Sequence, residues 1–212
     1  MTEKKKVVVL ISGNGSNLQA IIDQCHGQDA DIVAVISNKA DAYGLERAQN
    51  ADIPAQVILS KGKTREVFDG QLMEAIERHQ PDLVVLAGFM RILTPEFVRQ
   101  YQGKMINIHP SLLPKYQGLN THQRAIDAGD AEHGASVHFV TEELDGGPVI
   151  VQARVPVFDD DAASELAARV QTQELRIYPL AVKWFCSGRL IMNGAHAELD
   201  NAALSPAGYA AD

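Results

Sequence analysis

Residues 7–17 read VVVLISGNGSN, an apolar run that ends in a glycine-rich turn. A run of this kind is typical of a strand that is buried on both faces, as in a parallel sheet. Leu18, Ile21 and Cys25 follow at helical spacing, and residues 32–37 form a second apolar run. The stretch therefore predicts a strand, a helix and a second, parallel strand, joined by a right-handed crossover.

The same alternation continues to residue 108. Further strands are predicted at 56–59, 83–87 and 105–108, and helices at 43–51, at 64–79 and from Thr94 onward. Thr94 suits the N-cap of that last helix, because its hydroxyl can accept a hydrogen bond from a free backbone N–H, and Pro95 suits the first helical position. Open sheets bind ligands at the carboxyl ends of their strands, so we expect the loops after Ile11, Ala87 and Ile108 to meet.

The pattern changes after Pro110. Residues 136–140 and 149–157 are apolar runs separated only by a loop, which favours antiparallel pairing. Asp159–Asp161 are expected to open a long helix that ends at Gly188, because acidic side chains suit a helix N-terminus.

Length and composition indicate one folded domain. A chain of 212 residues can bury a complete core, and 46% hydrophobic residues is ordinary for a globular protein. The Ala-rich tail after Asn193 is weakly patterned and is expected to be a surface segment. The sequence therefore predicts a single domain over residues 1–212. Its fold class is an open twisted α/β sheet with a parallel, nucleotide-fold-like N-terminal half, added antiparallel strands and a long C-terminal helix.

Charge and cysteine content exclude several classes of protein. The chain has 19 Lys and Arg against 27 Asp and Glu, a net charge of −8, so a nucleic-acid partner is not expected. The longest apolar run, residues 83–90, is far shorter than the ~20 residues of a membrane span. Lys4–Lys6 precede an apolar stretch that is too short for a signal peptide. Two cysteines are too few for a disulfide framework, so the sequence predicts a cytoplasmic protein. The expected partners are small-molecule substrates, and the expected oligomeric state is a monomer or a homodimer.

Residues 13–17, GNGSN, lie between the first predicted strand and the first predicted helix. Glycine lets the backbone approach a ligand closely, and the N–H groups at a helix N-terminus attract phosphate. No Gly-Lys-Ser/Thr follows, as a Walker loop requires, and Leu18 stands where a dinucleotide fingerprint has its third glycine. The stretch predicts a phosphate-monoester site; the alternative is a plain tight turn with Ser16 as the helix cap.

Residues 107–114 read NIHPSLLP and are the most informative segment for chemistry. Alternate residues of a strand point to the same side, so Asn107 and His109 are expected to face one pocket. An amide N–H beside an imidazole can stabilise a developing oxyanion. A rigid loop with a core histidine is an equally good interpretation of these residues alone.

Asp145 and the pair Gln171 and Glu174 are polar residues for which the sequence allows two interpretations each. Asp145 begins a DGGP loop. A carboxylate there can orient a histidine and favour its charged form, or it can cap its own turn. Gln171 and Glu174 share one flank of the long predicted helix, which is either a solvated face or a ligand-facing edge.

The histidines do not have metal-ligand spacing. His109, His122, His133 and His138 form no His-x-x-x-His pair, and the chain has no Cys-x-x-Cys pair. A site without a metal is therefore predicted.

Four segments together resemble the folate-dependent formyltransferase family, in the branch that acts on glycinamide ribonucleotide. They are GNGSN at 13–17, GFMRIL at 88–93, NIHPSLLP at 107–114 and LDGGP at 144–148. The likeness extends from about Val7 to Tyr209. It implies an enzyme of de novo purine synthesis with 10-formyltetrahydrofolate as co-substrate. The formyl group would pass to the amine of glycinamide ribonucleotide by direct attack through a tetrahedral oxyanion, without a metal.

The resemblance also implies roles for individual residues. Asn107, His109 and Asp145 would be catalytic. The ribonucleotide would be held by Gly13, Asn14, Gly15, Ser16, Asn17, Gln171 and Glu174. The folate would be held by Arg65, Met90, Arg91, Ile92, Leu93, Asn107, Thr141, Glu142, Glu143, Leu144 and Asp145. Asn120 stands where the family has a histidine beside the site, which bears on local proton routing rather than on the reaction itself.

Three other functions would use parts of this pattern. A formyl-folate hydrolase would direct the same three catalytic residues at water and would be expected to carry a regulatory domain. A methionyl-tRNA formyltransferase would be expected to have further C-terminal sequence and a basic surface. A non-catalytic nucleotide-binding module would need only the glycine loop and would leave Asn107, His109 and Asp145 without a role.

Overall fold

The strand–helix–strand unit expected at the N-terminus is present. In the computed structural model, which describes residues 3–211, β1 (Lys5–Ile11) pairs in parallel with β2 (Ala30–Ser37), and α1 (Ser16–Cys25) connects them. Val7, Val9 and Ile11 pack in one core cluster with α1, whereas Val8 and Leu10 pack in a second cluster on the other face. β1 is apolar throughout its buried length because both of its faces are covered.

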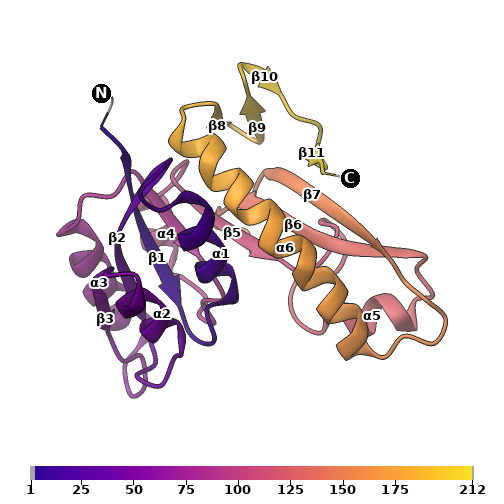
Figure 1. Ribbon diagram of the computed structural model, residues 1–212, viewed down its shortest axis with the longest axis horizontal. Helices are drawn as coiled ribbons and strands as arrows, with labels where there is room; N and C mark the ends of the chain where they lie inside the picture. The colour runs from indigo at the N-terminus through magenta and orange to yellow at the C-terminus, as the bar shows by residue number, and fades with distance from the viewer. Residues whose placement is uncertain (1–2, 212) are drawn as a thin grey trace.

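The central sheet continues this unit on both sides. Its strand order is β11-β7-β6-β5-β4-β1-β2-β3 (Figure 1). β3 (Ala55–Val57), β4 (Leu83–Leu86) and β5 (Met105–His109) extend the parallel part, and β6 (Glu132–Phe139) and β7 (Val149–Pro156) are antiparallel additions. The predicted fold class is confirmed.

Helices cover both faces of the sheet. α1, α2 (Gly44–Asn50) and α6 (Ala163–Cys186) contribute to one core cluster, and α3 (Arg65–Glu77) and α4 (Pro95–Gln100) to the other. Figure 1 shows α6, in orange, lying across β5, β6 and β7. The predicted cap of α4 is confirmed: the Thr94 hydroxyl accepts a hydrogen bond from the Phe97 N–H at 3.2 Å, and Pro95 is the first helical residue.

α6 begins later than the sequence suggested. The prediction that Asp159–Asp161 open this helix was wrong, because Asp161 accepts a hydrogen bond from the Phe158 N–H and pairs with Arg169 at 2.8 Å in a turn before the helix. The Arg169 guanidinium lowers the pKa of Asp161 to about 2. The acidic residue in the first turn of the helix is instead Glu165.

α6 also contains Pro179 in its interior. A proline has no N–H, so the carbonyl four residues earlier loses its helical donor. Here the Gln24 side chain of α1 donates to that carbonyl, on Leu175, at 3.3 Å. The contact between α1 and α6 therefore compensates for the proline.

The tail is more ordered than expected. β8 (Leu190–Asn193), β9 (His196–Leu199) and β10 (Ala202–Ala203) form a small antiparallel sheet, and β11 (Tyr209–Ala210) pairs with β7. The Tyr209 ring packs edge-on against Trp184 at 5.3 Å. Strands of two to four residues are too short to show a period in the sequence, and the same holds for the unpredicted seven-residue α5 (Thr121–Asp127). No helix within residues 3–211 is long and apolar enough to cross a membrane.

Candidate active site

Asn107 and His109 lie on one face of β5, as the strand period predicts. In the antiparallel pairing with β6, Asn107 stands opposite His138 and His109 opposite Ser136. Ile106 and Ile108 point to the other face, where they join the core beneath α6. β5 therefore presents two polar side chains at its carboxyl end and anchors them with its apolar ones.

His109 is held by two partners. Its Nε2 lies 2.8 Å from the Tyr116 carbonyl oxygen, and because a carbonyl only accepts, Nε2 carries a proton. Its Nδ1 lies 3.6 Å from Asp145 Oδ1, with both side chains less than a tenth exposed. The second Asp145 oxygen accepts a hydrogen bond from the Gly118 N–H at 2.9 Å. A protonated His109 ring therefore forms a shielded ion pair with Asp145.

The Asn107 amide lies beside His138, which the sequence analysis considered only as a metal ligand. Its Nδ2 lies 3.5 Å from His138 Nε2, at the outer limit of a hydrogen bond, and His138 Nδ1 donates to the Phe139 carbonyl at 2.9 Å. Complete burial lowers the pKa of His138, so its ring is neutral and its Nε2 accepts. The position of His138 on the same face as Asn107 could have been found only from the β5–β6 register.

The glycine loop, residues 13–17, lies at the carboxyl end of β1. Gly15 is the N-cap of α1 with φ +77°, and a Cβ there would lie 2.8 Å from the Gly44 Cα, so only glycine fits. Arg47 Nε donates to the Asn14 carbonyl at 2.8 Å, a contact that the sequence did not indicate. The free N–H groups at the start of α1 and this guanidinium give the loop a positive potential that suits phosphate.

The flank of α6 predicted as a ligand edge lies against this loop. The Asn17 side chain contacts the Glu174 carboxylate; burial raises the pKa of Glu174, and Asn17 opposes that rise. Gln171, one turn earlier on α6, is exposed. The structure thus brings Glu174 of the helix to Asn17 of the loop, two of the residues that the resemblance assigned to the ribonucleotide.

Residues 89–93, the Met90 loop, follow β4. Met90 and Ile92 expose 65% and 56% of their surface, which is unusual for neighbouring apolar side chains and typical of a ligand surface. The Arg91 guanidinium lies 5.1 Å from the centre of the Phe68 ring of α3. Arg65 begins the same helix and is exposed; Leu93 is half-buried.

Residues 141–148 lie in the loop that joins β6 to β7. Leu144 is 56% exposed, and Glu142 forms an ion pair with Arg99 at 2.9 Å. Thr141 is half-buried, and the Glu143 carbonyl accepts a hydrogen bond from the Gly146 N–H. Gly147 is required, because a Cβ there would lie 1.8 Å from the Phe139 carbonyl oxygen. A hollow of about 290 Å³ lies between this loop, including Asp145, and tail residues that include His196 and Pro206.

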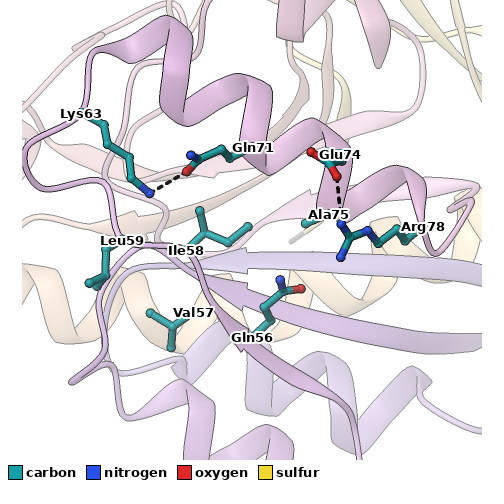
Figure 2. Close-up of a pocket in the computed structure, with 9 residues that line it drawn as sticks. All are labelled: Gln56, Val57, Ile58, Leu59, Lys63, Gln71, Glu74, Ala75 and Arg78. Carbon is teal, nitrogen blue, oxygen red and sulfur yellow. Dashed lines mark hydrogen bonds and ion pairs between the residues drawn. The ribbon is translucent and has the colours of Figure 1, made fainter.

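A larger hollow of about 410 Å³ lies elsewhere, between β3 and α3 (Figure 2). The cations on its wall are already paired, Lys63 with Gln71 at 2.6 Å and Arg78 with Glu74 at 2.8 Å. The predicted site residues do not line it. The site that the sequence predicted therefore lies at the carboxyl edge of β1, β4 and β5 and not in the larger hollow.

Two of the four histidines considered for a metal form a pair of their own. His122 Nδ1 lies 3.2 Å from His133 Nε2. Asn120 precedes α5 with φ +57°, a conformation that asparagine tolerates well. In residues 3–211, no group of three or more His, Cys, Asp or Glu side chains is placed to hold a metal ion.

The buried His133 predicts acid sensitivity. Burial, reinforced by His122, lowers its pKa to about 4, whereas an unfolded histidine titrates near 6.5. The unfolded chain therefore binds a proton that the folded protein rejects, and the free energy of unfolding should fall as the pH drops from about 6.5 toward 4, by up to about 1.4 kcal/mol per pH unit. Urea unfolding at several pH values measures this slope.

His133→Gln should flatten that pH dependence, whatever it does to the stability at pH 7. His79→Gln, just beyond the end of α3, is the matched control and should leave the slope as it is in the parent. An equal slope in the parent and in His133→Gln would show that another group causes the acid sensitivity.

The fold and the site together define a small-molecule group-transfer enzyme. A histidine–carboxylate pair and an amide donor stand beside a phosphate-type loop at the ligand-binding edge of an open α/β sheet. The model of the formyl transferase family matches residues 5–182. The chain belongs to this family, and the predicted formyltransferase is confirmed.

Individual relatives support the assignment to the formyl transferase family. The phosphoribosylglycinamide formyltransferase of Escherichia coli (strain K12) is 58% identical over 209 residues, covering 97% of this chain and 99% of that protein. The trifunctional purine biosynthetic protein adenosine-3 of Homo sapiens is 48% identical over 191 residues, 88% of this chain but 19% of that protein. The structure of the phosphoribosylglycinamide formyltransferase of Coxiella burnetii, in complex with CHES, has a TM-score of 0.93 at 52% identity and covers 98% of this chain and 99% of that one.

Proposed function

We propose that the protein transfers the formyl group of 10-formyltetrahydrofolate to the amine of glycinamide ribonucleotide, a step of purine synthesis. The observation that carries this proposal is the pairing of His109 with Asp145 on the same strand edge as Asn107, between two loops suited to two different ligands. The names of the relatives at 58% and 52% identity support the choice of substrates.

Each loop offers the chemistry that one substrate needs. The glycine loop has N–H donors and the Arg47 guanidinium for a phosphate. The exposed apolar side chains of Met90, Ile92 and Leu144 suit a flat ring system such as that of a folate. The ribonucleotide and the folate would then approach each other over the end of β5.

The residues of β5 and Asp145 would carry out the transfer. As the substrate amine bonds to the formyl carbon, the carbonyl oxygen becomes an oxyanion, and the Asn107 amide donates a hydrogen bond to it. His109, as imidazolium, stabilises the same charge and gives a proton to the departing folate nitrogen. Asp145 keeps the ring charged and accepts the amine proton through water. No covalent enzyme intermediate is required.

Release of tetrahydrofolate tests this proposal. Purified protein with 10-formyltetrahydrofolate should release it only when glycinamide ribonucleotide is present, and formylated ribonucleotide should appear in equal amount. Activity should withstand a chelator and need no nicotinamide. Equal release without the ribonucleotide would support the hydrolase alternative, and loss of activity with chelator would refute a metal-free reaction.

We also propose a cytoplasmic location. Cys25 and Cys186 are free thiols, a state that a reducing compartment maintains. The predicted choice between monomer and homodimer is tested by light scattering of the purified protein.

A further inference from the structure

We propose that Ser12 and Asn38 are positioning residues that tie the folate-binding Met90 loop to the base of the glycine loop. Neither residue belongs to the predicted site. The inference rests on the proposed function, because it assumes that residues 89–93 bind the folate.

A chain of hydrogen bonds crosses the carboxyl edge of four neighbouring strands. The Met90 N–H donates to Ser12 Oγ at 2.8 Å, after β4 and β1 respectively. The Ser12 hydroxyl donates to Asn38 Oδ1 at 2.5 Å, just beyond β2. Asn38 Nδ2 donates to Ser60 Oγ at 3.1 Å, on the segment that follows β3.

The direction of this chain is fixed by its first donor. A backbone N–H can only donate, so Ser12 Oγ must accept from Met90 and is free to give its own proton onward. Asn38 must then turn its oxygen to Ser12 and its amide N–H to Ser60. The Met90 N–H, the Ser12 hydroxyl and one Asn38 N–H each find an acceptor, which favours one arrangement of these side chains.

Burial makes the chain rigid. Ser12 is 5% exposed and Asn38 is 4% exposed, so water cannot easily replace a lost partner. The Met90 side chain, by contrast, is 65% exposed. The Met90 loop therefore gains its fixed backbone from these two polar groups beneath it.

The hydrogen bonds of Ser12 fix the spacing of the two ligand loops. Ser12 directly precedes the glycine loop, and its own N–H donates to the Gly88 carbonyl at 3.1 Å. The two ligand loops are thus joined at their roots by two hydrogen bonds through one residue. The distance between a phosphate at residues 13–17 and a folate at residues 89–93 is set before either ligand binds, which favours transfer because reacting groups must meet in a narrow geometry.

The test compares Ser12→Ala and Asn38→Ala with Ser37→Ala in the 212-residue chain. Ser37 is the matched control, because it is also buried at the end of β2 but its hydroxyl bonds only to the Lys39 backbone, donating to the carbonyl and accepting from the N–H. Two readouts are measured: amide hydrogen exchange of Met90 by NMR without ligand, and KM and kcat for both substrates.

We expect Met90 to exchange at least about fivefold faster in Ser12→Ala, because its amide loses its acceptor, and somewhat faster in Asn38→Ala. The KM for 10-formyltetrahydrofolate should rise about five- to tenfold in both variants, with a smaller change in the KM for the ribonucleotide. Ser37→Ala should change neither readout. The double variant Ser12→Ala/Asn38→Ala should be no worse than Ser12→Ala, because the two residues act in one chain.

Unchanged Met90 exchange in Ser12→Ala would overturn the proposed contact. Faster exchange with an unchanged folate KM would overturn the positioning role. Equal effects in Ser37→Ala would show a general loosening of the strand ends, which also overturns it. If the parent transfers no formyl group, the proposed function fails, whereas the exchange of Met90 still reports on the hydrogen-bond chain.

Discussion

Asn107→Ala is expected to lower kcat by on the order of 10² or more while the fold persists. Loss of one oxyanion donor typically costs this much, because the donor acts on charge that exists only in the transition state. The Asn107 side chain is half-buried, and its contact with His138, at 3.5 Å, is long, so its removal should cost little stability. Steady-state kinetics and a thermal midpoint for each protein measure the two effects separately.

His109→Ala is expected to reduce kcat at least as much as Asn107→Ala. It removes the group that stabilises the oxyanion as a cation and supplies the proton to the leaving nitrogen. Asn50→Ala, at the exposed end of α2, removes an amide that is not among the predicted site residues and should leave kcat at the parent value. A large drop in thermal midpoint with unchanged kcat in either site variant would instead identify a residue of the core.

Asp145→Asn is expected to lower kcat by on the order of 10² or more and to shift the pH profile. The asparagine can still accept the hydrogen bond from the Gly118 N–H, so the shape of the loop is kept. Its amide would face the His109 Nδ1, now 3.6 Å from Asp145, with a donor where the carboxylate was an acceptor. A donor at that place favours the neutral ring, which can neither stabilise the oxyanion as a cation nor give a proton.

The sign of the shift follows from that change. In the proposed mechanism the protonated ring is the active form, so activity should fall at alkaline pH. Because the nearby carboxylate favours the protonated form, its removal should move the alkaline limb of kcat/KM against pH to lower pH. NMR titration of the His109 ring in both proteins gives an independent measurement of the same shift.

Asp200→Asn is the matched control for this experiment. Both residues have a positive φ, +51° at Asp145 and +54° at Asp200. Asp200 also pairs its carboxylate with a basic side chain, Arg189 at 2.8 Å, but it lies in the tail between β9 and β10. The pH profile of kcat/KM for Asp200→Asn should coincide with that of the parent. An unmoved His109 titration in Asp145→Asn would show that the two side chains are not partners.

The amino-acid sequence determined the parallel part of the fold and the location of the chemistry. Apolar runs such as residues 7–11 predict strands buried on both faces, and only a sheet with helices on each side buries them so. The strand period placed Asn107 and His109 on one side of β5, and the glycine loop marked the carboxyl end of β1. These features are local, because each depends on residues that lie within a few positions of one another.

Only the tertiary structure decided which of these groups meet. Asp145 reaches His109 because the loop between β6 and β7 returns over the end of β5, and His138 faces Asn107 because of one register in the β5–β6 pair. The link from Met90 through Ser12 to Asn38 exists because β1 lies between β4 and β2 in the sheet, although β4 and β1 are not consecutive in the chain. A sequence pattern records the period at which side chains are buried, whereas such contacts depend on strand order and register, which are set by the packing of the whole core.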